Sequence, residues 1–229
     1  MNRPRREGGR LARRIGRVRA GVVAGLAATV LLAGVAGAQP PIAAAEVARE
    51  APRLADLIAL IPGTTIAEIG AGHGEMTVAM AKLTGPTGRV YATELNPGRL
   101  ADIRAAVSRA GLKNVTVVQA GEEATNLPDS CCQAIYMREV YHHLTDPTAI
   151  DASLFRALRP GGLLAIIDFP PGGGAAAVPP GVPKDRGGHG IPSNVLVHEL
   201  TAVGFQVARE IPDWGDGLYA MLFQKPTPR

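Results

Sequence analysis

The sequence predicts an α/β protein built on a doubly wound, largely parallel sheet of seven strands that ends in an antiparallel hairpin. Strand and helix patterns alternate from residue 46 to residue 203 without an internal repeat, which favours helices on both faces of a parallel sheet. The segment 163–167 is apolar throughout, as is typical of a buried parallel strand. The last two strands, 205–210 and 218–224, are joined by too few residues for a crossover, so they must pair as a hairpin. The arrangement is Rossmann-like.

The order of the elements follows from periodicity and from turn residues. Pro62-Gly63 ends the first helix, whereas Asn96-Pro97 opens the third with a good cap and a proline suited to a first turn. Ser193 is expected to cap the last helix, and a turn is expected at 159–162. The predicted helices span 46–61, 75–83, 97–110, 146–158 and 195–203, and the first five predicted strands span 65–69, 89–93, 114–118, 132–137 and 163–167.

The first 38 residues have the pattern of a signal peptide or a membrane anchor. A basic stretch up to Arg19 precedes an uncharged run from Ala20 to Ala38, and Ala36-Gly37-Ala38 fits a small-x-small cleavage pattern. The run approaches the length of about 20 residues that spans a bilayer, so an uncleaved anchor stays open. We expect residues 39–229 to form one domain that is exported to the periplasm or held at the membrane, and cytoplasmic only if the translation start is misplaced.

Net charge bears on the class of partner, and the two cysteines bear on disulfide bonding. Residues 1–38 hold 8 of the 24 Lys and Arg residues and 1 of the 20 Asp and Glu residues, so the remainder carries a net charge of −3. A mildly acidic domain without interleaved basic and aromatic residues argues against nucleic acid as a partner. Cys131 and Cys132 are adjacent, and we expect them to stay unbridged at the start of a strand because the ring of such a disulfide is strained.

A glycine-rich loop follows the first strand directly. Gly70, Gly72 and Gly74 come after a strand that ends at Ile69, at the edge where sheets of this kind bind ligands. Glycine permits positive φ angles and lets the backbone pass close beneath a ligand. About 20 residues further on, Glu94 ends the second strand and is placed to accept hydrogen bonds from two ribose hydroxyls. The loop therefore predicts a ligand that contains a nucleoside.

Two features argue against a dinucleotide as that ligand. The loop has the spacing G-x-G-x-G, and not the G-x-G-x-x-G that brings a helix N-terminus onto a pyrophosphate. Glu68 stands at the entry of the loop, where its negative charge opposes a pyrophosphate and suits a ligand that carries sulfonium and ammonium groups.

Five successive motifs resemble those of the class I methyltransferases that use S-adenosylmethionine (SAM). They are Ile66 to Gly74, Val90 to Glu94, Leu127-Pro128, Tyr141 to Leu144 and Leu158 to Gly162. The similarity runs from about residue 58 to the C-terminus. It is greatest to the small-molecule group that contains the ubiquinone and menaquinone C-methyltransferases, and to predicted exported bacterial methyltransferases. The resemblance implies SAM as the cofactor and a small molecule as the methyl acceptor.

The resemblance also implies which residues bind the cofactor. Glu68, Gly70 and Gly72 would hold the methionine part of SAM, and Glu94 would hold the ribose. Either Glu122 or Glu123 would meet the adenine amino group, and the motif leaves both open. The end of the fourth strand, Met137 to Glu139, would line the pocket. The full implied set is Glu68, Gly70, Ala71, Gly72, Gly74, Glu94, Leu95, Glu122, Glu123 and Met137.

Methyl transfer from a sulfonium mainly requires that two reactants be positioned, and a base is needed only when the acceptor must lose a proton. Glu139, His142 and His143 are the candidate catalytic residues. Two adjacent histidines are expected to point in different directions, so no metal site is expected. The loop 170–192 is expected to carry a substrate-side lid at 184–191. Further polar candidates near the strand ends and this loop are Tyr141, Asp168 and His189.

The sequence thus predicts methyl transfer from SAM to a small molecule by a monomer that touches a membrane only through an uncleaved N-terminal segment. One alternative is a protein of the same fold that binds SAM without transferring its methyl group. Another is an NAD(P)-dependent oxidoreductase, against which the loop spacing argues. An exported domain would lie away from the main SAM supply of the cell. The sequence nevertheless combines a signal-like N-terminal segment with the motifs of a SAM-binding domain.

Overall fold

The computed structural model describes residues 40–172, 178, 180–186 and 188–228. The predicted signal peptide or anchor at 1–38 lies outside the described residues, as do parts of the loop 170–192. Contacts divide the chain into the units 1–38 and 39–229, and every described element belongs to the second. Within the described ranges, no helix is both long enough and apolar enough to cross a bilayer.

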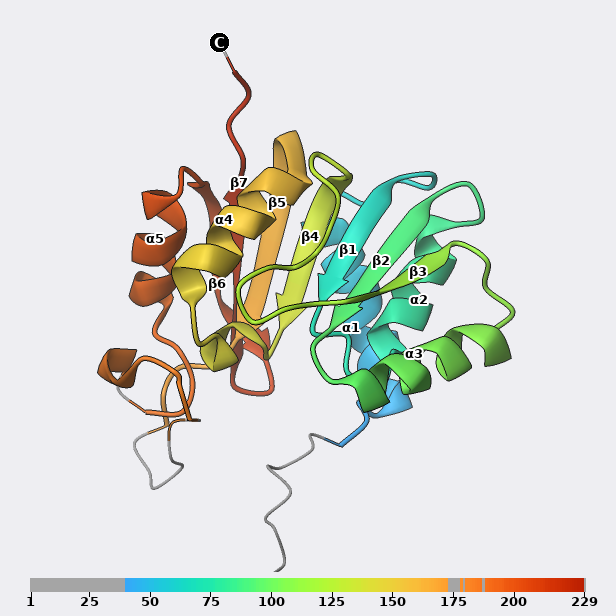
Figure 1. Cartoon of the computed structure of the whole chain (residues 1–229), viewed down its shortest axis with the longest axis horizontal. Helices are drawn as coiled ribbons and strands as arrows, with labels where there is room; N and C mark the ends of the chain where they lie inside the picture. The colour runs from blue at the N-terminus through green and yellow to red at the C-terminus, as the bar shows by residue number, and fades with distance from the viewer. Residues whose placement is uncertain (1–39, 173–177, 179, 187, 229) are drawn as a thin grey trace, which may run out of the picture. The chain divides into compact units, whose positions relative to one another are not determined.

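One sheet of seven strands forms the centre of the unit 39–229 (Figure 1). The strand order is β3-β2-β1-β4-β5-β7-β6. β1 to β5 pair in parallel, whereas β7 is antiparallel to both β5 and β6. The predicted fold, with its C-terminal hairpin, is confirmed. The strands are β1 (Thr65–Ile69), β2 (Arg89–Glu94), β3 (Val115–Gln119), β4 (Cys132–Arg138), β5 (Leu158–Asp168), β6 (Gln206–Gly215) and β7 (Leu218–Gln224).

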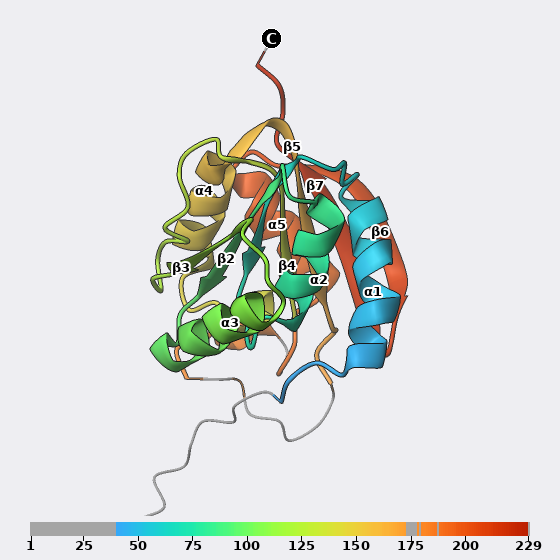
Figure 2. The same ribbon diagram turned by 90° about the vertical axis from the view of Figure 1, so that its right-hand side faces the viewer.

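Helices cover both faces of this sheet. Figures 1 and 2 show α1 and α2 on one face and α4 and α5 on the other. α3 packs beside α2 against β2 and β3. The helices are α1 (Ala44–Leu57), α2 (Glu75–Thr84), α3 (Pro97–Arg109), α4 (Pro147–Ala157) and α5 (Ser193–Ala202), with the short 3-10 helices η1 (Tyr141–His143) and η2 (Lys184–Arg186).

Alternate side chains of the central strands divide the core into two layers. Tyr136 and Ile167 belong to the layer beneath α1 and α2, whereas their neighbours Ile135 and Ile166 belong to the layer beneath α4 and α5. Each fully buried side chain of this size stabilises the fold by roughly 1.5–3 kcal/mol. The burial of both faces explains why the central strands read as continuous apolar runs.

Two local predictions are wrong. The predicted turn at 159–162 is part of β5, which bends without ending because Gly161 takes a φ of +77° and the register to β4 shifts between Cys132 and Ala134. Ser193 is the first residue of α5 and not its cap. Pro192 occupies the cap position instead, and no side chain caps the helix there.

The prediction of two unbridged cysteines is also wrong, because Cys131 and Cys132 form a disulfide. Cys132 is the fully buried first residue of β4, and Cys131 precedes the strand. The chain turns at Ser130, which has a φ of +50°. Adjacent side chains point to opposite faces only within an extended strand, and this pair lies where the strand begins.

Candidate functional site

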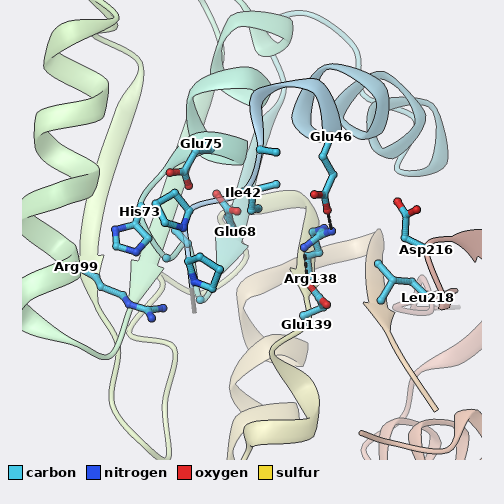
Figure 3. A pocket seen from close by; sticks show the side chains of 16 residues that line it. Ile42, Glu46, Glu68, His73, Glu75, Arg99, Arg138, Glu139, Asp216 and Leu218 are labelled. Atoms are coloured by element: carbon cyan, nitrogen blue, oxygen red, sulfur yellow. Dashed lines mark hydrogen bonds and ion pairs between the residues drawn. The ribbon is translucent and has the colours of Figure 1, made fainter. Parts of the chain in front are cut away.

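The carboxyl ends of β1 and β4 lie where the strand order reverses, which is the usual ligand position in open α/β sheets. Two adjoining cavities open there, with volumes of about 480 and 240 Å³, and they share Gly70, Arg99 and Glu139. Figure 3 shows the first and larger of the two, which reaches from the glycine loop to the start of α1. The second extends past Glu94 and the loop after β3 to His143.

The glycine loop is shaped by two different requirements. Gly70 has a φ of +71°, and a Cβ atom added there would lie 2.5 Å from Cγ2 of Val140, so glycine is needed for close packing. Gly72 has a φ of +56°, but an added Cβ would meet only Nη1 of Arg99, at 4.0 Å. Because Gly72 and Arg99 both line the first cavity, this part of the loop forms an open cradle on the ligand side.

The Glu94 carboxylate ties this loop to the end of β2. It accepts hydrogen bonds from the backbone N–H groups of Gly72 (2.9 Å), Leu95 (2.9 Å) and Asn96 (3.0 Å). Glu94 is buried, yet it lines the second cavity together with Leu95. The residue predicted to hold a ribose therefore also fixes the backbone of the glycine loop.

Glu68 places an acid at the floor of the first cavity. Its carboxylate is buried and accepts a hydrogen bond from the hydroxyl of Thr77 on α2. Burial raises the pKa of Glu68 to about 7, with nearby Glu75 and Glu94 adding to the effect. A carboxylate in this setting gains most from a cationic ligand, because such a ligand offsets the cost of burying the charge.

The remaining cofactor candidates divide into residues on the cavity walls and residues away from them. Ala71 lines the first cavity, and Glu122, but not Glu123, lines the second. Gly74 lines neither: it precedes α2, and a Cβ added there would lie 3.1 Å from Cα of Ile103 on α3. Met137 is fully buried in the core beneath α4 and lines neither cavity, whereas Arg138 and Glu139 after it do reach the first.

Arg138 joins α1 to the end of β4 at the wall of the first cavity. Its guanidinium pairs with Glu46, with Glu139 and, at 2.7 Å, with Glu50 (Figure 3 shows the first two). The Arg138 side chain is only 9% exposed. Glu50 also accepts a hydrogen bond from the indole N–H of Trp214 on β6, at 2.9 Å. Three segments that are distant in the sequence, namely α1, the end of β4 and β6, are therefore joined around one buried cation.

Glu139 is the candidate catalytic residue that both cavities share. Its φ of +52° is uncommon for a residue other than glycine, and such strain gathers at functional sites. Its carboxylate pairs with Arg138. This pairing holds the Glu139 side chain at the junction of the two cavities.

His142 and His143 lie close together in η1, so the expectation that they point apart is wrong. Their ring centroids are 4.0 Å apart. His142 is buried, and its Nδ1 lies 2.8 Å from Oδ1 of Asp168. Since a carboxylate only accepts, Nδ1 donates this hydrogen bond, and in the neutral imidazole the lone pair is then on Nε2. Asp168 also accepts hydrogen bonds from the backbone N–H groups of His142 (3.2 Å) and Phe169 (2.9 Å).

His143 is the histidine that faces the second cavity. Partial burial of its ring lowers the pKa of His143, an otherwise exposed residue, to about 4, and the neighbouring His142 and His189 lower it further. His143 is therefore neutral at physiological pH. The ring of His189, from the loop 170–192, lies 4.8 Å from that of His142 and 5.7 Å from that of His143 between centroids.

A buried polar cluster anchors the described part of that loop. Arg186 of η2 is 1% exposed and donates to the backbone carbonyl of Tyr141 (3.2 Å) and to the carboxylate of Glu199 on α5 (3.2 Å). The Tyr141 hydroxyl lies 2.7 Å from Asp151 and 2.8 Å from Glu199. Tyr141 thus faces this cluster and lines neither cavity. The anchoring holds η2 against the domain, next to the histidines.

The fold and the glycine loop described above are similar to those of SAM-dependent methyltransferases, as comparisons with known proteins show. The family model described as "Methyltransferase domain" matches residues 67–166, which run from β1 into β5. The match covers the glycine loop, Glu94 and η1.

Among curated proteins, the chain is similar to the ubiquinone/menaquinone biosynthesis C-methyltransferase of Marinomonas sp. (strain MWYL1). The two are 32% identical over 108 residues, which is 47% of this chain and 43% of that protein. The chain therefore matches less than half the length of such relatives.

Solved structures share the fold at low identity. A SAM-dependent methyltransferase from Aquifex aeolicus superposes with a TM-score of 0.66 at 22% identity, covering 80% of this chain and 99% of that one. The [4+2]-cyclase SpnF superposes with a TM-score of 0.64 at 16% identity, covering 79% and 81%. One fold thus carries proteins named for different reactions.

Several residues of the cavities are not among those predicted from the sequence. Arg99, at the start of α3, lines both cavities, and residues 40–43 form a wall of the first together with Asp216 and Leu218 of the C-terminal hairpin region. The position of Arg99, just after Asn96-Pro97 at the end of β2, is a signal that points to the same sheet edge. The other segments carry no such signal, because only the folded chain brings them there.

Proposed function

We propose that this domain binds SAM across the two cavities and transfers its methyl group to a small molecule. The observation that carries the proposal is the coupling of Glu94 to Gly72. One carboxylate orders the open glycine cradle and also faces the second cavity, where a ribose would lie. Glu68, Gly70, Ala71 and Gly72 would then hold the methionine part, and Glu94, Leu95 and Glu122 the adenosine part.

The residues present fit this cofactor on physical grounds. The open space at Gly72 can take a ligand group, and the buried Glu68 carboxylate favours a cation at the floor of the first cavity. A pyrophosphate in the same place would meet Glu68 at short range, which disfavours NAD(P). SAM, when bound, supplies a methyl group that its sulfonium has already activated.

The chain's own residues are then needed chiefly for position and for the exclusion of water. Arg138, Glu46 and Glu50 hold α1 against the end of β4 and so fix one wall of the first cavity. Glu139, at the junction of the cavities, and His143, on the wall of the second, are the charged or titratable groups best placed to meet an acceptor. The names of the curated relatives, as C-methyltransferases of quinone biosynthesis, support a small-molecule acceptor.

Isothermal titration with SAM and with S-adenosylhomocysteine tests the cofactor assignment. We expect wild-type protein to bind both, and Glu94→Ala to bind each at least about tenfold more weakly. The variant loses three hydrogen bonds to backbone N–H groups, one of them to the glycine loop, each worth roughly 1 kcal/mol. Glu123→Ala is the matched control, because this nearby acid lines neither cavity. Equal affinities in all three proteins, or no binding by wild type, would refute the assignment.

A second candidate function is SAM binding without methyl transfer. The specific observation in its favour is the shared fold of the [4+2]-cyclase SpnF. Incubating the protein with methyl-labelled SAM and fractionated extract of small molecules separates the two functions. Label transferred by wild type and lost in Glu94→Ala supports transfer, whereas binding without any transfer supports the second candidate.

A further inference from the structure

Three histidines converge beside the second cavity. One ring nitrogen from each of His142, His143 and His189 lies within 4.8 Å of the others. Two come from η1 and the third from the loop 170–192, so the cluster forms only when the loop is anchored. Arg186, three residues before His189, supplies that anchor through Tyr141 and Glu199.

One ring nitrogen of this histidine cluster lacks a hydrogen-bond partner. Nε2 of His142 is buried and has no hydrogen-bond partner among the described residues. In the neutral imidazole this nitrogen carries the lone pair, because Nδ1 donates to Asp168. A buried polar atom without a partner costs about 1–3 kcal/mol, so such an atom in a folded protein calls for a ligand.

The hydrogen bond between His142 and Asp168 resembles the one that orients histidine ligands in metal sites. Histidines that bind a metal through one nitrogen almost always donate the other N–H to a carboxylate or a carbonyl, which fixes the ring and its tautomer. His142 and Asp168 have this geometry, and Asp168 is itself held by two backbone N–H groups.

We propose that His142, His143 and His189 form a site for a divalent transition metal, best suited to Zn²⁺, with Asp168 as the carboxylate that orients His142. Imidazole ligands favour Zn²⁺ over Ca²⁺ and Mg²⁺, which take oxygen. Ligand bonds of about 2.0–2.1 Å in a tetrahedral site place the nitrogens about 3.4 Å apart, so the rings must approach one another by at most about 1.4 Å. His189, on a partly exposed loop, can make most of that movement.

Three protein ligands leave a fourth position for water or for an oxygen atom of a bound molecule, which is the pattern of catalytic zinc sites. Because His143 also lines the second cavity, the site borders the space assigned above to the cofactor. Metal binding uses the lone pair of His142 Nε2, which then does not accept a proton. Only the identity of the fourth ligand rests on the proposed function; the metal site itself does not.

The test uses the full chain without a polyhistidine tag, after a chelator has removed any bound metal. The buffer contains no reducing agent, so that Cys131 and Cys132 stay bridged. Zn²⁺ is titrated in competition with a chromogenic chelator, and Co²⁺ serves as a spectroscopic probe of ligand geometry. We expect one Zn²⁺ per chain, and at least tenfold weaker binding in His189→Ala. His198→Ala is the matched control, because it removes one exposed histidine from α5 and should change affinity less than twofold.

Asp168→Asn is the second variant, and it keeps all three imidazoles. We expect zinc affinity to fall about 10- to 100-fold, as is typical when a carboxylate that orients a metal-binding histidine is removed. The Co²⁺ spectrum should also change. Circular dichroism confirms that each variant is folded. Wild-type protein that binds no Zn²⁺, or binding that His189→Ala and His198→Ala reduce equally, would overturn the proposal. The titration uses metal alone, without SAM or an acceptor. Its result therefore tests the metal site independently of whether the protein transfers a methyl group.

Discussion

The pH dependence of SAM affinity tests the cofactor assignment, because it reports on the ionisation of the buried acid Glu68. Its pKa of about 7 means that the apo protein holds a proton on Glu68 below neutral pH. A cationic ligand in the first cavity interacts best with the ionised carboxylate, so below pH 7 that proton must leave when the ligand binds. Glu68→Gln keeps the size of the side chain and an oxygen for the Thr77 hydroxyl, but it removes the ionisation.

The expected size follows from the fraction of ionised Glu68. With a pKa of about 7, the apparent Kd for SAM rises by a factor of about 11 at pH 6 and about 1.1 at pH 8 relative to fully ionised protein. Wild type should therefore bind SAM about tenfold more tightly at pH 8 than at pH 6. Glu68→Gln should bind with nearly the wild-type affinity at pH 6 and lack the gain at pH 8.

Isothermal titration at pH 6, 7 and 8 measures both proteins under the same conditions. The α-amino group of the ligand titrates near pH 7.7–8.0 and affects both equally, so the ratio of the two Kd values isolates Glu68. Titrations in two buffers of different ionisation enthalpy should also show proton release at pH 6 in wild type alone. A Kd ratio that stays constant from pH 6 to pH 8 would show that Glu68 does not meet the cation.

Three further predictions concern stability. The raised pKa of Glu68 means that its contribution to wild-type stability is greatest below its ordinary value of 4.5 and is lost as pH rises to about 7. Urea unfolding should therefore show about 3 kcal/mol of pH dependence that Glu68→Gln lacks, and identical profiles would contradict this. Gly70→Ala should cost about 2–5 kcal/mol, since its Cβ would overlap Val140, whereas Gly72→Ala should cost only about 1–2 kcal/mol yet weaken SAM binding; equal costs would refute this account of the loop. Arg138→Met should cost about 3–5 kcal/mol by leaving the buried Glu50 unpaired, while Arg49→Ala, which breaks the exposed pair with Asp216, should cost less than about 1 kcal/mol, as thermal and urea unfolding can show.

Short-range patterns are what the sequence predicts well. The order of strands and helices, the hairpin and the glycine loop with Glu94 all follow from periodicity and turn residues over a few dozen positions. The loop motif predicts positive φ angles and a close approach to a ligand for its glycines alike, but it gives no separate packing reason for a glycine at Gly70. That reason is Val140, which is 70 positions away and touches Gly70 only in the folded sheet.

The parts that were missed depend on contacts between distant segments. The Arg138 cluster joins Glu46, Glu50 and Trp214, and no spacing in the sequence relates them. The convergence of the histidines depends on the tight turn of η1, which brings adjacent side chains together, and on the buried Arg186, which fixes the loop that carries His189. A charged residue in a Pro/Gly-rich loop would ordinarily be expected to be solvated, so its anchoring role is invisible before folding.

The segment before α1 matters for how the N-terminal boundary of this domain is chosen. Residues 40–43 precede the first helix and add little to the two core layers, yet they form one wall of the first cavity. A shortened chain that begins at Ala44 would keep the residues of every described helix and strand and would lose only the Ala43 carbonyl that accepts the first backbone hydrogen bonds of α1. It would nevertheless present an opened cavity, and weak cofactor binding by such a chain would reflect the cut and not the family. Binding studies therefore need chains that retain Pro40 and Pro41, whatever is removed upstream of them.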